Sequence, residues 1–191
     1  MIEQPIIAIY DANILYPAPL RDLLIRIAQS GLVLARWSET IHDEWTRNVL
    51  KANPDLSAER LARTRSLMNE AVRDCLVTGH KKFIATLSLP DPEDRHVLAA
   101  AICAKAAVIV TFNLKDFPAK TLARFDIKAQ HPDAFLADLL NQSSGLFCAA
   151  VKRQRESLRN PLRTIEELLT TLENQGLIQT VIRLRQYIDL L

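Results

Sequence analysis

Short apolar runs alternate with amphipathic segments over residues 1–130. Ile6–Tyr10 is a continuous run rich in β-branched residues, and Val108–Phe112 repeats the pattern. Such runs are typical of strands that are buried on both faces of a parallel sheet. Leu32–Leu34 offers a third strand. Because helical patterns separate these runs, the sequence predicts an α/β domain with a central parallel sheet flanked by helices.

Apolar residues between the runs recur every three or four positions, which predicts helices with one buried face. Leu20–Ile27 has this spacing. Ser38 and Ser57 are expected to cap two further helices, since a serine hydroxyl can accept from an N–H group of the first turn; the second of these helices is expected to run to about Thr78. Pro92 fits the first position of a fourth helix.

From Pro132 onward the pattern is purely helical. Four periodic segments are expected, at Ala134–Leu140, Leu146–Leu158, Ile165–Leu172 and Leu177–Leu190. We therefore divide the chain into a domain at residues 1–130 and a C-terminal helical extension at residues 131–191. The apolar residues of the last segment are expected either to cover the domain or to form a dimer contact.

Composition limits the class of protein. A chain of 191 residues with 49% apolar residues can bury an ordinary core. The formal charge of +2 gives no overall sign of a polyelectrolyte partner, so a nucleic-acid site must be local. Three separated cysteines favour a reduced, cytoplasmic protein without structural zinc. Neither a leader at the N-terminus nor a membrane-spanning segment is expected.

Four acidic residues fall where an α/β fold would bring them together. Asp11 directly follows the first strand, Asp116 follows the run that ends at Phe112, Asp94 lies close to Pro92, and Glu44 lies on the helix after Ser38. The carboxyl ends of parallel strands meet at one edge of a sheet. Close carboxylates repel by about 4 kcal/mol per pair at an effective dielectric near 20, so such a cluster needs a cation. Oxygen ligands without thiol or imidazole favour Mg²⁺ or Mn²⁺, which commonly serve phosphodiester chemistry.

Each acid also has an ordinary structural explanation. Asp11 can cap a helix or a turn. Asp91 can cap the helix that Pro92 begins, and Asp94, three residues later, can complete a capping box. Asp116 can instead start a helix. Glu44 can belong to a solvated helix face. The joint pattern, and no single acid, carries the prediction of a metal site.

The segments that contain these acids are Asp11-Ala-Asn-Ile-Leu15, Ile41-His-Asp-Glu-Trp45, Leu89–Ala101 and Val110–Pro118. In this order they resemble the PIN-domain family of metal-dependent ribonucleases, particularly its VapC-like branch, over about residues 5–130. The resemblance implies that the four acids Asp11, Glu44, Asp94 and Asp116 bind one or two Mg²⁺ or Mn²⁺ ions for RNA cleavage. It also implies a parallel sheet between helices, a homodimer, and a small antitoxin protein that silences the enzyme.

Further residues receive supporting roles. Asn13, Thr111 and Asn113 are expected to orient the carboxylates or a water molecule, with turn formation as the alternative, and Asp91 is expected to assist the four acids. The candidate contacts to RNA phosphates are Arg47, Lys51, Arg95 and Lys115.

These expectations define one leading function and two alternatives. The leading hypothesis is a divalent-metal-dependent endoribonuclease, the toxin of a toxin–antitoxin pair, with no membrane partner. One alternative is a catalytically silent PIN-like scaffold that holds RNA or a protein. The other is a metal-dependent small-molecule phosphatase; Asn13 counts against the haloacid-dehalogenase type, because that family has an aspartate at this place.

Overall fold

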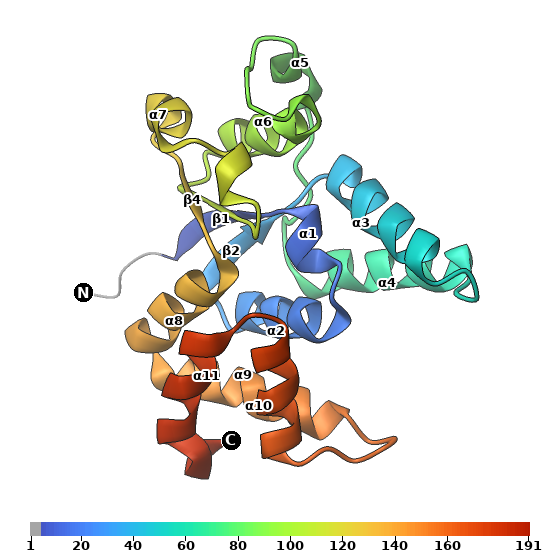
Figure 1. Cartoon of the computed structure of the whole chain (residues 1–191), viewed down its shortest axis with the longest axis vertical. Coiled ribbons are helices and arrows are strands. Elements are labelled where there is room, and N and C mark those ends of the chain that lie inside the picture. Colours follow the sequence, from blue (N-terminus) through green and yellow to red (C-terminus); the bar gives the residue numbers. More distant parts are fainter. Residues whose placement is uncertain (1–4) are drawn as a thin grey trace.

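A four-stranded parallel sheet with helices around it forms the centre of the computed structural model, which describes residues 5–191 (Figure 1). The strands are β1 (Ile6–Tyr10), β2 (Val33–Arg36), β3 (Val108–Val110) and β4 (Lys128–Gln130), in the spatial order β2-β1-β3-β4. The predicted α/β fold with a parallel sheet is confirmed. The predicted domain start at Met1 and the predicted lack of a leader involve residues 1–4, which lie outside the described residues.

The two central strands are the two continuous apolar runs. β1 pairs with β2 on one side and with β3 on the other, so both edges of β1 are covered. Ala8, Ile9 and Tyr10 are accordingly inaccessible to solvent. The strand predicted at Val108–Phe112 ends two residues earlier, at Val110.

β4 was not predicted. It is a short edge strand with partly polar sequence, Lys-Ala-Gln, and it pairs with β3 alone through Val108↔Lys128 and Val110↔Gln130. Since an edge strand buries little of its surface, its sequence carries no apolar run that would reveal it.

Helices cover the sheet and carry most of the chain. The first seven are α1 (Ala12–Leu15), α2 (Ala18–Gln29), α3 (Glu39–Ala52), α4 (Ala58–Ala71), α5 (Lys81–Ile84), α6 (Arg95–Ala104) and α7 (Ala119–Leu122). Three short 3₁₀ helices accompany them: η1 (Pro92–Asp94), η2 (Leu114–Asp116) and η3 (Ala123–Phe125). The predicted caps are present: the hydroxyl of Ser38 accepts from the N–H of Ile41, and that of Ser57 accepts from the N–H of Arg60, each at 3.2 Å.

α4 is shorter than the sequence predicts. It ends at Ala71 instead of near Thr78, because residues 72–74 form a turn and the chain around Leu76 then pairs with Trp37, the residue after β2. The N–H of Trp37 donates to the carbonyl of Cys75 at 2.9 Å, and the N–H of Val77 donates to the carbonyl of Trp37 at 2.8 Å. This long-range pairing competes with the local helix pattern and overrides it.

The four helices predicted after Pro132 are present, with altered ends. They are α8 (Pro132–Gln142), α9 (Ser144–Ser157), α10 (Ile165–Asn174) and α11 (Ile178–Leu184), the last continued by η4 (Arg185–Leu190). They lie together at the lower end of the view, where α9 packs on α2 (Figure 1). The division of the chain at residue 130 stays a prediction.

The apolar residues of the last predicted helix divide between two surfaces. Leu177, Val181 and Leu184 are inaccessible and join the core, whereas Ile178 and Ile182 are 55% and 54% exposed. The expected role of covering the domain therefore explains the buried face of this segment and does not explain its exposed apolar face. Within residues 5–191, no helix is long and apolar enough to cross a membrane.

Candidate active site

Asp11 lies at the carboxyl end of β1 and is 3% exposed. Its carboxylate accepts three hydrogen bonds, from the N–H of Ala12, the side-chain amide of Asn13 and the hydroxyl of Thr111, each at 2.7 Å. Thr111 directly follows β3, so neighbouring strands hold the acid between them. Asp11 also serves as the N-cap of α1. The structural and the functional interpretations of this residue are therefore compatible.

Asn13 and Thr111 contact each other as well as Asp11. The side-chain amide of Asn13 donates to the hydroxyl oxygen of Thr111 at 2.9 Å, and the same oxygen accepts from the backbone N–H of Asn113. The contact of Asn113 is thus made by its main chain, and the expected role of its side chain stays a prediction. These bonds form a small network that fixes the orientation of the Asp11 carboxylate.

Asp94 lies at the junction of η1 and α6, and its side chain makes no capping hydrogen bond. The cap is Asp91, whose carboxylate accepts from the N–H of Glu93 at 2.9 Å. The capping alternative is therefore correct for Asp91 and wrong for Asp94. Among the described residues, the buried Oδ2 of Asp94 has no hydrogen-bond partner.

Burial and neighbouring acids raise the pKa values of Asp11 and Asp94. Burial raises the pKa of Asp11 from 3.8 to about 6, and Glu44 adds to the increase. Burial also raises the pKa of Asp94 from 3.8 to about 7, with further contributions from Asp11, Asp91, Asp116 and Glu44. Groups that act on one another in this way lie within electrostatic reach. The tertiary structure thus brings together acids from distant parts of the chain, the first of which is Asp11 and the last Asp116.

Glu44 reaches this cluster from α3, with its side chain 29% exposed. Its Oε2 accepts a hydrogen bond from Nε2 of His96 at 3.1 Å. His96 is 12% exposed in its side chain, and its buried Nδ1 has no partner among the described residues. Sequence reasoning missed His96, because 52 positions separate it from Glu44. The one available signal was its place two residues after Asp94 in Asp-Arg-His.

Asp116 is the last residue of η2 and does not start a helix, so that alternative is wrong. The next helix, α7, begins at Ala119 after Pro118. Asp116 reaches the cluster from the loop that follows β3, where it contributes to the raised pKa of Asp94.

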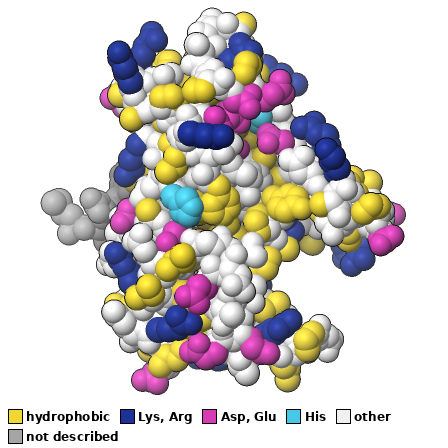
Figure 2. All heavy atoms as spheres, viewed as in Figure 1, with side chains coloured by type: hydrophobic (Ala, Val, Ile, Leu, Met, Phe, Trp, Pro, Cys, Tyr) yellow, Lys and Arg dark blue, Asp and Glu magenta, His cyan; other side chains and the backbone are white. Residues whose placement is uncertain are grey.

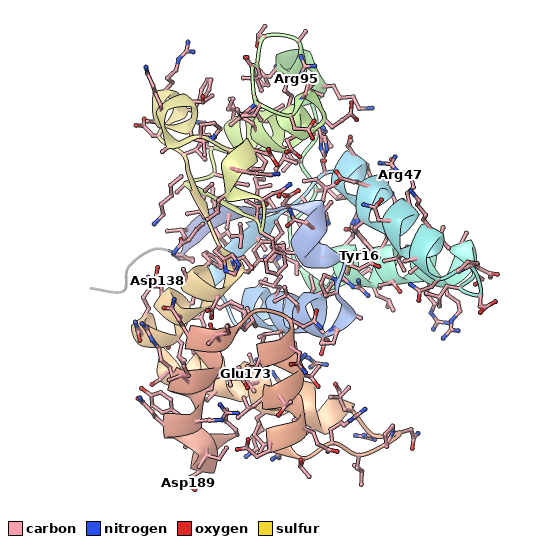
Figure 3. The ribbon with its side chains drawn as sticks, viewed as in Figure 1. Tyr16, Arg47, Arg95, Asp138, Glu173 and Asp189 are labelled. Carbon is pink, nitrogen blue, oxygen red and sulfur yellow. The ribbon has the colours of Figure 1, made fainter. Side chains whose placement is uncertain are left out.

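The basic residues expected to contact RNA lie near these elements. Arg47 and Lys51 are exposed on α3, Lys115 is exposed in η2, and Arg95 begins α6, with its Nε donating to the carbonyl of Pro92 at 2.9 Å. Figure 3 labels Arg47 on α3 and Arg95 above it, near α6. In Figure 2, acidic side chains gather in the upper part of the viewed face, with basic side chains on both sides of them.

The donor set fits a hard divalent cation in its chemistry, because it consists of carboxylate oxygens and includes one buried oxygen, Oδ2 of Asp94, without a hydrogen-bond partner. In the arrangement observed for residues 5–191, however, no three His, Cys, Asp or Glu side chains are close enough to share a metal ion. Asp11 is held by three donors and Glu44 by His96. Joint coordination would therefore require the carboxylates to rotate toward one another.

Comparison with known proteins finds a family model for each of two parts of the chain. A family model described as "PIN domain" matches residues 8–115, and one described as "VapC50 C-terminal domain" matches residues 132–186. A curated protein of Mycobacterium tuberculosis (strain ATCC 25618 / H37Rv), named "Putative ribonuclease VapC50", is 43% identical over 97 residues. That match covers 51% of this chain and 57% of the relative's own length. No solved structure matches the chain significantly.

Proposed function

The chain belongs to the PIN-domain family, in its VapC-like branch, and on that basis we propose that it is a divalent-metal-dependent endoribonuclease. The observation that carries the proposal is the state of Asp94: one buried oxygen without a partner among the described residues, in a carboxyl group whose pKa is raised by burial and further by four other acids. A bound cation would relieve this repulsion. The name of the curated relative, which describes a ribonuclease, supports the same class of reaction.

In this proposal the metal ligands are Asp11, Glu44, Asp94 and Asp116, which would hold one or two Mg²⁺ or Mn²⁺ ions. A bound ion would lower the pKa of an attacking water and would neutralise charge on the phosphate. The protein's own part is orientation. Asn13 and Thr111 hold the carboxylate of Asp11, and His96 holds that of Glu44.

The basic residues near the acids would bind the RNA backbone. Arg47 and Lys51 on α3, together with Arg95 and Lys115, can each neutralise a phosphate, which positions the strand without selecting its sequence. Asp91 is exposed beside Asp94 and would add to the negative field that attracts the cation.

The biological setting follows from the VapC-like branch and is proposed with the activity. The enzyme would act in the cytoplasm as the toxin of a toxin–antitoxin pair, as a homodimer that a small antitoxin protein inhibits. Co-expression with and without a neighbouring small open reading frame would test this setting, since the active chain alone should arrest growth.

The activity itself is tested by incubating purified protein with total RNA in Mg²⁺, in Mn²⁺ and in EDTA. We expect cleavage only with the metals, and a loss of at least about 100-fold in Asp94→Asn, which removes a charge with almost no change of shape. Glu93→Gln is the matched control, because Glu93 is an exposed acid next to Asp94. Circular dichroism verifies that each variant is folded.

Four outcomes would contradict the proposal. Cleavage in EDTA would exclude the metal mechanism, and full activity of Asp94→Asn would exclude the acidic site. Hydrolysis of p-nitrophenyl phosphate without RNA cleavage would instead indicate a phosphatase. Binding of RNA without cleavage, and without heat of binding for millimolar Mn²⁺, would indicate a scaffold.

A further inference from the structure

An aromatic pair begins at the residue after Thr111, whose hydroxyl holds Asp11. The ring of Phe112 meets the imidazole of His131 edge to face, with ring centroids 5.1 Å apart and an interplanar angle of 71°. Both side chains are only partly buried. The pair therefore has aromatic surface that the core does not cover.

The main chain ties this pair to the acids. The backbone N–H of Phe112 donates to Oδ1 of Asn13 at 3.1 Å, and the amide nitrogen of Asn13 donates to Oδ2 of Asp11 at 2.7 Å. Phe112 also directly follows Thr111, the other side chain that holds Asp11. A nucleotide whose phosphate lies at the carboxylates would consequently have its base, or that of its neighbour, close to the pair.

His131 is held in place from the opposite side. It is the N-cap of α8, and its Nδ1 accepts from the backbone N–H of Asp133 at 3.2 Å. This bond assigns the proton to Nε2, which becomes available as a donor to a base or a sugar. The imidazole is thus a fixed part of the surface.

The C-terminal extension borders the same surface. Gly176, in the turn between α10 and α11, has a positive φ of +88°, and a Cβ built there would lie 3.6 Å from Cε1 of Phe112. This turn therefore closes one edge of the phenyl ring. On the viewed face, a histidine and several hydrophobic side chains lie below the acidic ones, and Tyr16, 37% exposed, lies to the right of centre (Figures 2 and 3).

We propose that Phe112 and His131 form a stacking subsite for one nucleobase next to the cleaved phosphate. Aromatic rings bind exposed bases through their faces, whereas the basic residues bind phosphates only. The subsite rests on the proposed ribonuclease function and adds to it a contact to the base. Because the Gly176 turn borders it, the C-terminal extension forms part of the RNA site.

The test uses an RNA oligonucleotide that the wild-type protein cleaves, and copies of it that carry one abasic nucleotide on either side of the cleaved bond. Binding is measured by fluorescence anisotropy in the non-cleaving Asp94→Asn background. Phe112→Leu keeps apolar volume without a ring, and His131→Asn keeps a side chain that can cap α8. Phe125→Leu is the control, since Phe125 is also partly buried but lies on η3 beside Lys105 and Ile127.

We expect the double variant Phe112→Leu/His131→Asn to bind intact RNA about 5- to 150-fold more weakly, the range for loss of stacking on one base. One abasic position should weaken binding by a similar factor when Phe112 and His131 are intact, and should have no further effect on the double variant, because both changes remove the same contact. Phe112→Tyr and Phe125→Leu should bind normally.

Additive effects of the variant and the abasic site, or normal binding by the folded double variant, would overturn the subsite while leaving the ribonuclease function intact. If the double variant does not fold, normal binding of every abasic RNA by the Asp94→Asn protein with Phe112 and His131 intact would likewise overturn the subsite. A wild-type protein that cleaves no RNA would overturn the proposed function and the subsite together.

Discussion

His96 on the first turn of α6 donates a hydrogen bond from Nε2 to Oε2 of Glu44 on α3, over 3.1 Å. This bond joins the helix that begins beside Asp94 to the helix that carries the other acid. Since Nδ1 of His96 has no partner among the described residues, the imidazole is oriented by Glu44, and Glu44 in turn by the imidazole.

The first prediction concerns this bond. His96→Leu removes the donor, so Glu44 loses its fixed orientation, and Mn²⁺ affinity should fall about 10- to 100-fold. His96→Gln, whose amide can reach a similar position, should retain most of the affinity. Calorimetric titration of Mn²⁺ measures both. Equal affinity for the leucine variant and wild type would show that His96 has no part in metal binding.

The second prediction separates two acids by their hydrogen bonds. In EDTA at pH 8, Asp94→Asn should raise the free energy of unfolding by about 1 to 2 kcal/mol, a value reduced for solvent screening. The substitution removes a charge that burial and the neighbouring acids disfavour, and it breaks no hydrogen bond. Asp11→Asn should lower it by about 1 to 3 kcal/mol, since three donors converge on this carboxylate and an amide nitrogen cannot accept from them. Urea unfolding provides the measurement. Glu93→Gln, an exposed neighbour, should change little; stabilisation by Asp11→Asn would contradict the assignment of its hydrogen bonds.

The third prediction is a pH dependence. The pKa values of Asp11 and Asp94 are raised from 3.8 to about 6 and about 7. Between about pH 4 and pH 7 the folded protein therefore binds more protons than the unfolded chain, and these acids lower the free energy of unfolding as the pH rises. Above about pH 7 both carboxyl groups are largely deprotonated in the folded protein as well, and their destabilising effect reaches its full size. Mn²⁺ should stabilise the protein more at pH 8 than at pH 5, because the ligands must be deprotonated.

Two buried histidines oppose this trend. Burial lowers the pKa of His42 and of His80, so their contribution rises with pH up to about 6.5. The informative quantity is thus the difference in melting temperature between wild type and Asp94→Asn in EDTA. It should grow in favour of the variant from pH 5 to pH 8, and a constant difference would rule out the raised pKa of Asp94.

The fourth prediction concerns the attachment of α11. The carboxylate of Asp133, 6% exposed at the start of α8, accepts from the N–H groups of Gln179 and Thr180 at 2.9 and 2.8 Å, and from the Thr180 hydroxyl at 2.8 Å. Asp133→Ala should cost about 2 to 4 kcal/mol in urea unfolding, because buried donors lose their acceptor. Asp138→Ala, exposed on the same helix (Figure 3), should cost less than about 0.5 kcal/mol. Equal effects of the two substitutions would disprove this role of Asp133.

The fifth prediction concerns the RNA backbone. Each phosphate contact to single-stranded RNA contributes about 0.7 to the slope of log affinity against log salt. Replacing Arg47, Lys51, Arg95 and Lys115 with glutamine should therefore reduce the slope by about 3. Lys105→Gln/Lys128→Gln is the control. Lys105 lies shortly before β3 and Lys128 begins β4, so both lie at the amino ends of the strands, away from the carboxyl ends that carry the acids. An unchanged slope in the fourfold variant would remove this surface from the RNA site.

Local sequence was sufficient where one segment decides its own structure. Ile6–Tyr10 forms the central strand because a continuous apolar run is stable only when both its faces are covered. Asp11 follows at the carboxyl end, so its place at the edge of the sheet could be deduced from the run alone. Ser38 and Ser57 mark their helix starts by chemistry that acts over three residues.

Other features depended on contacts between distant segments, which no local pattern contains. The end of α4 is set by the pairing of Trp37 with the segment around Leu76, and β4 exists because β3 offers it hydrogen bonds. Sequence left Asp94 equally suited to be a cap or a ligand; only the folded chain shows that Asp91 is the cap. The sequence alone thus predicted which types of residue form the site. Tertiary packing decided their hydrogen-bond partners and their raised pKa values, because burial and charge act between residues that are distant in the sequence.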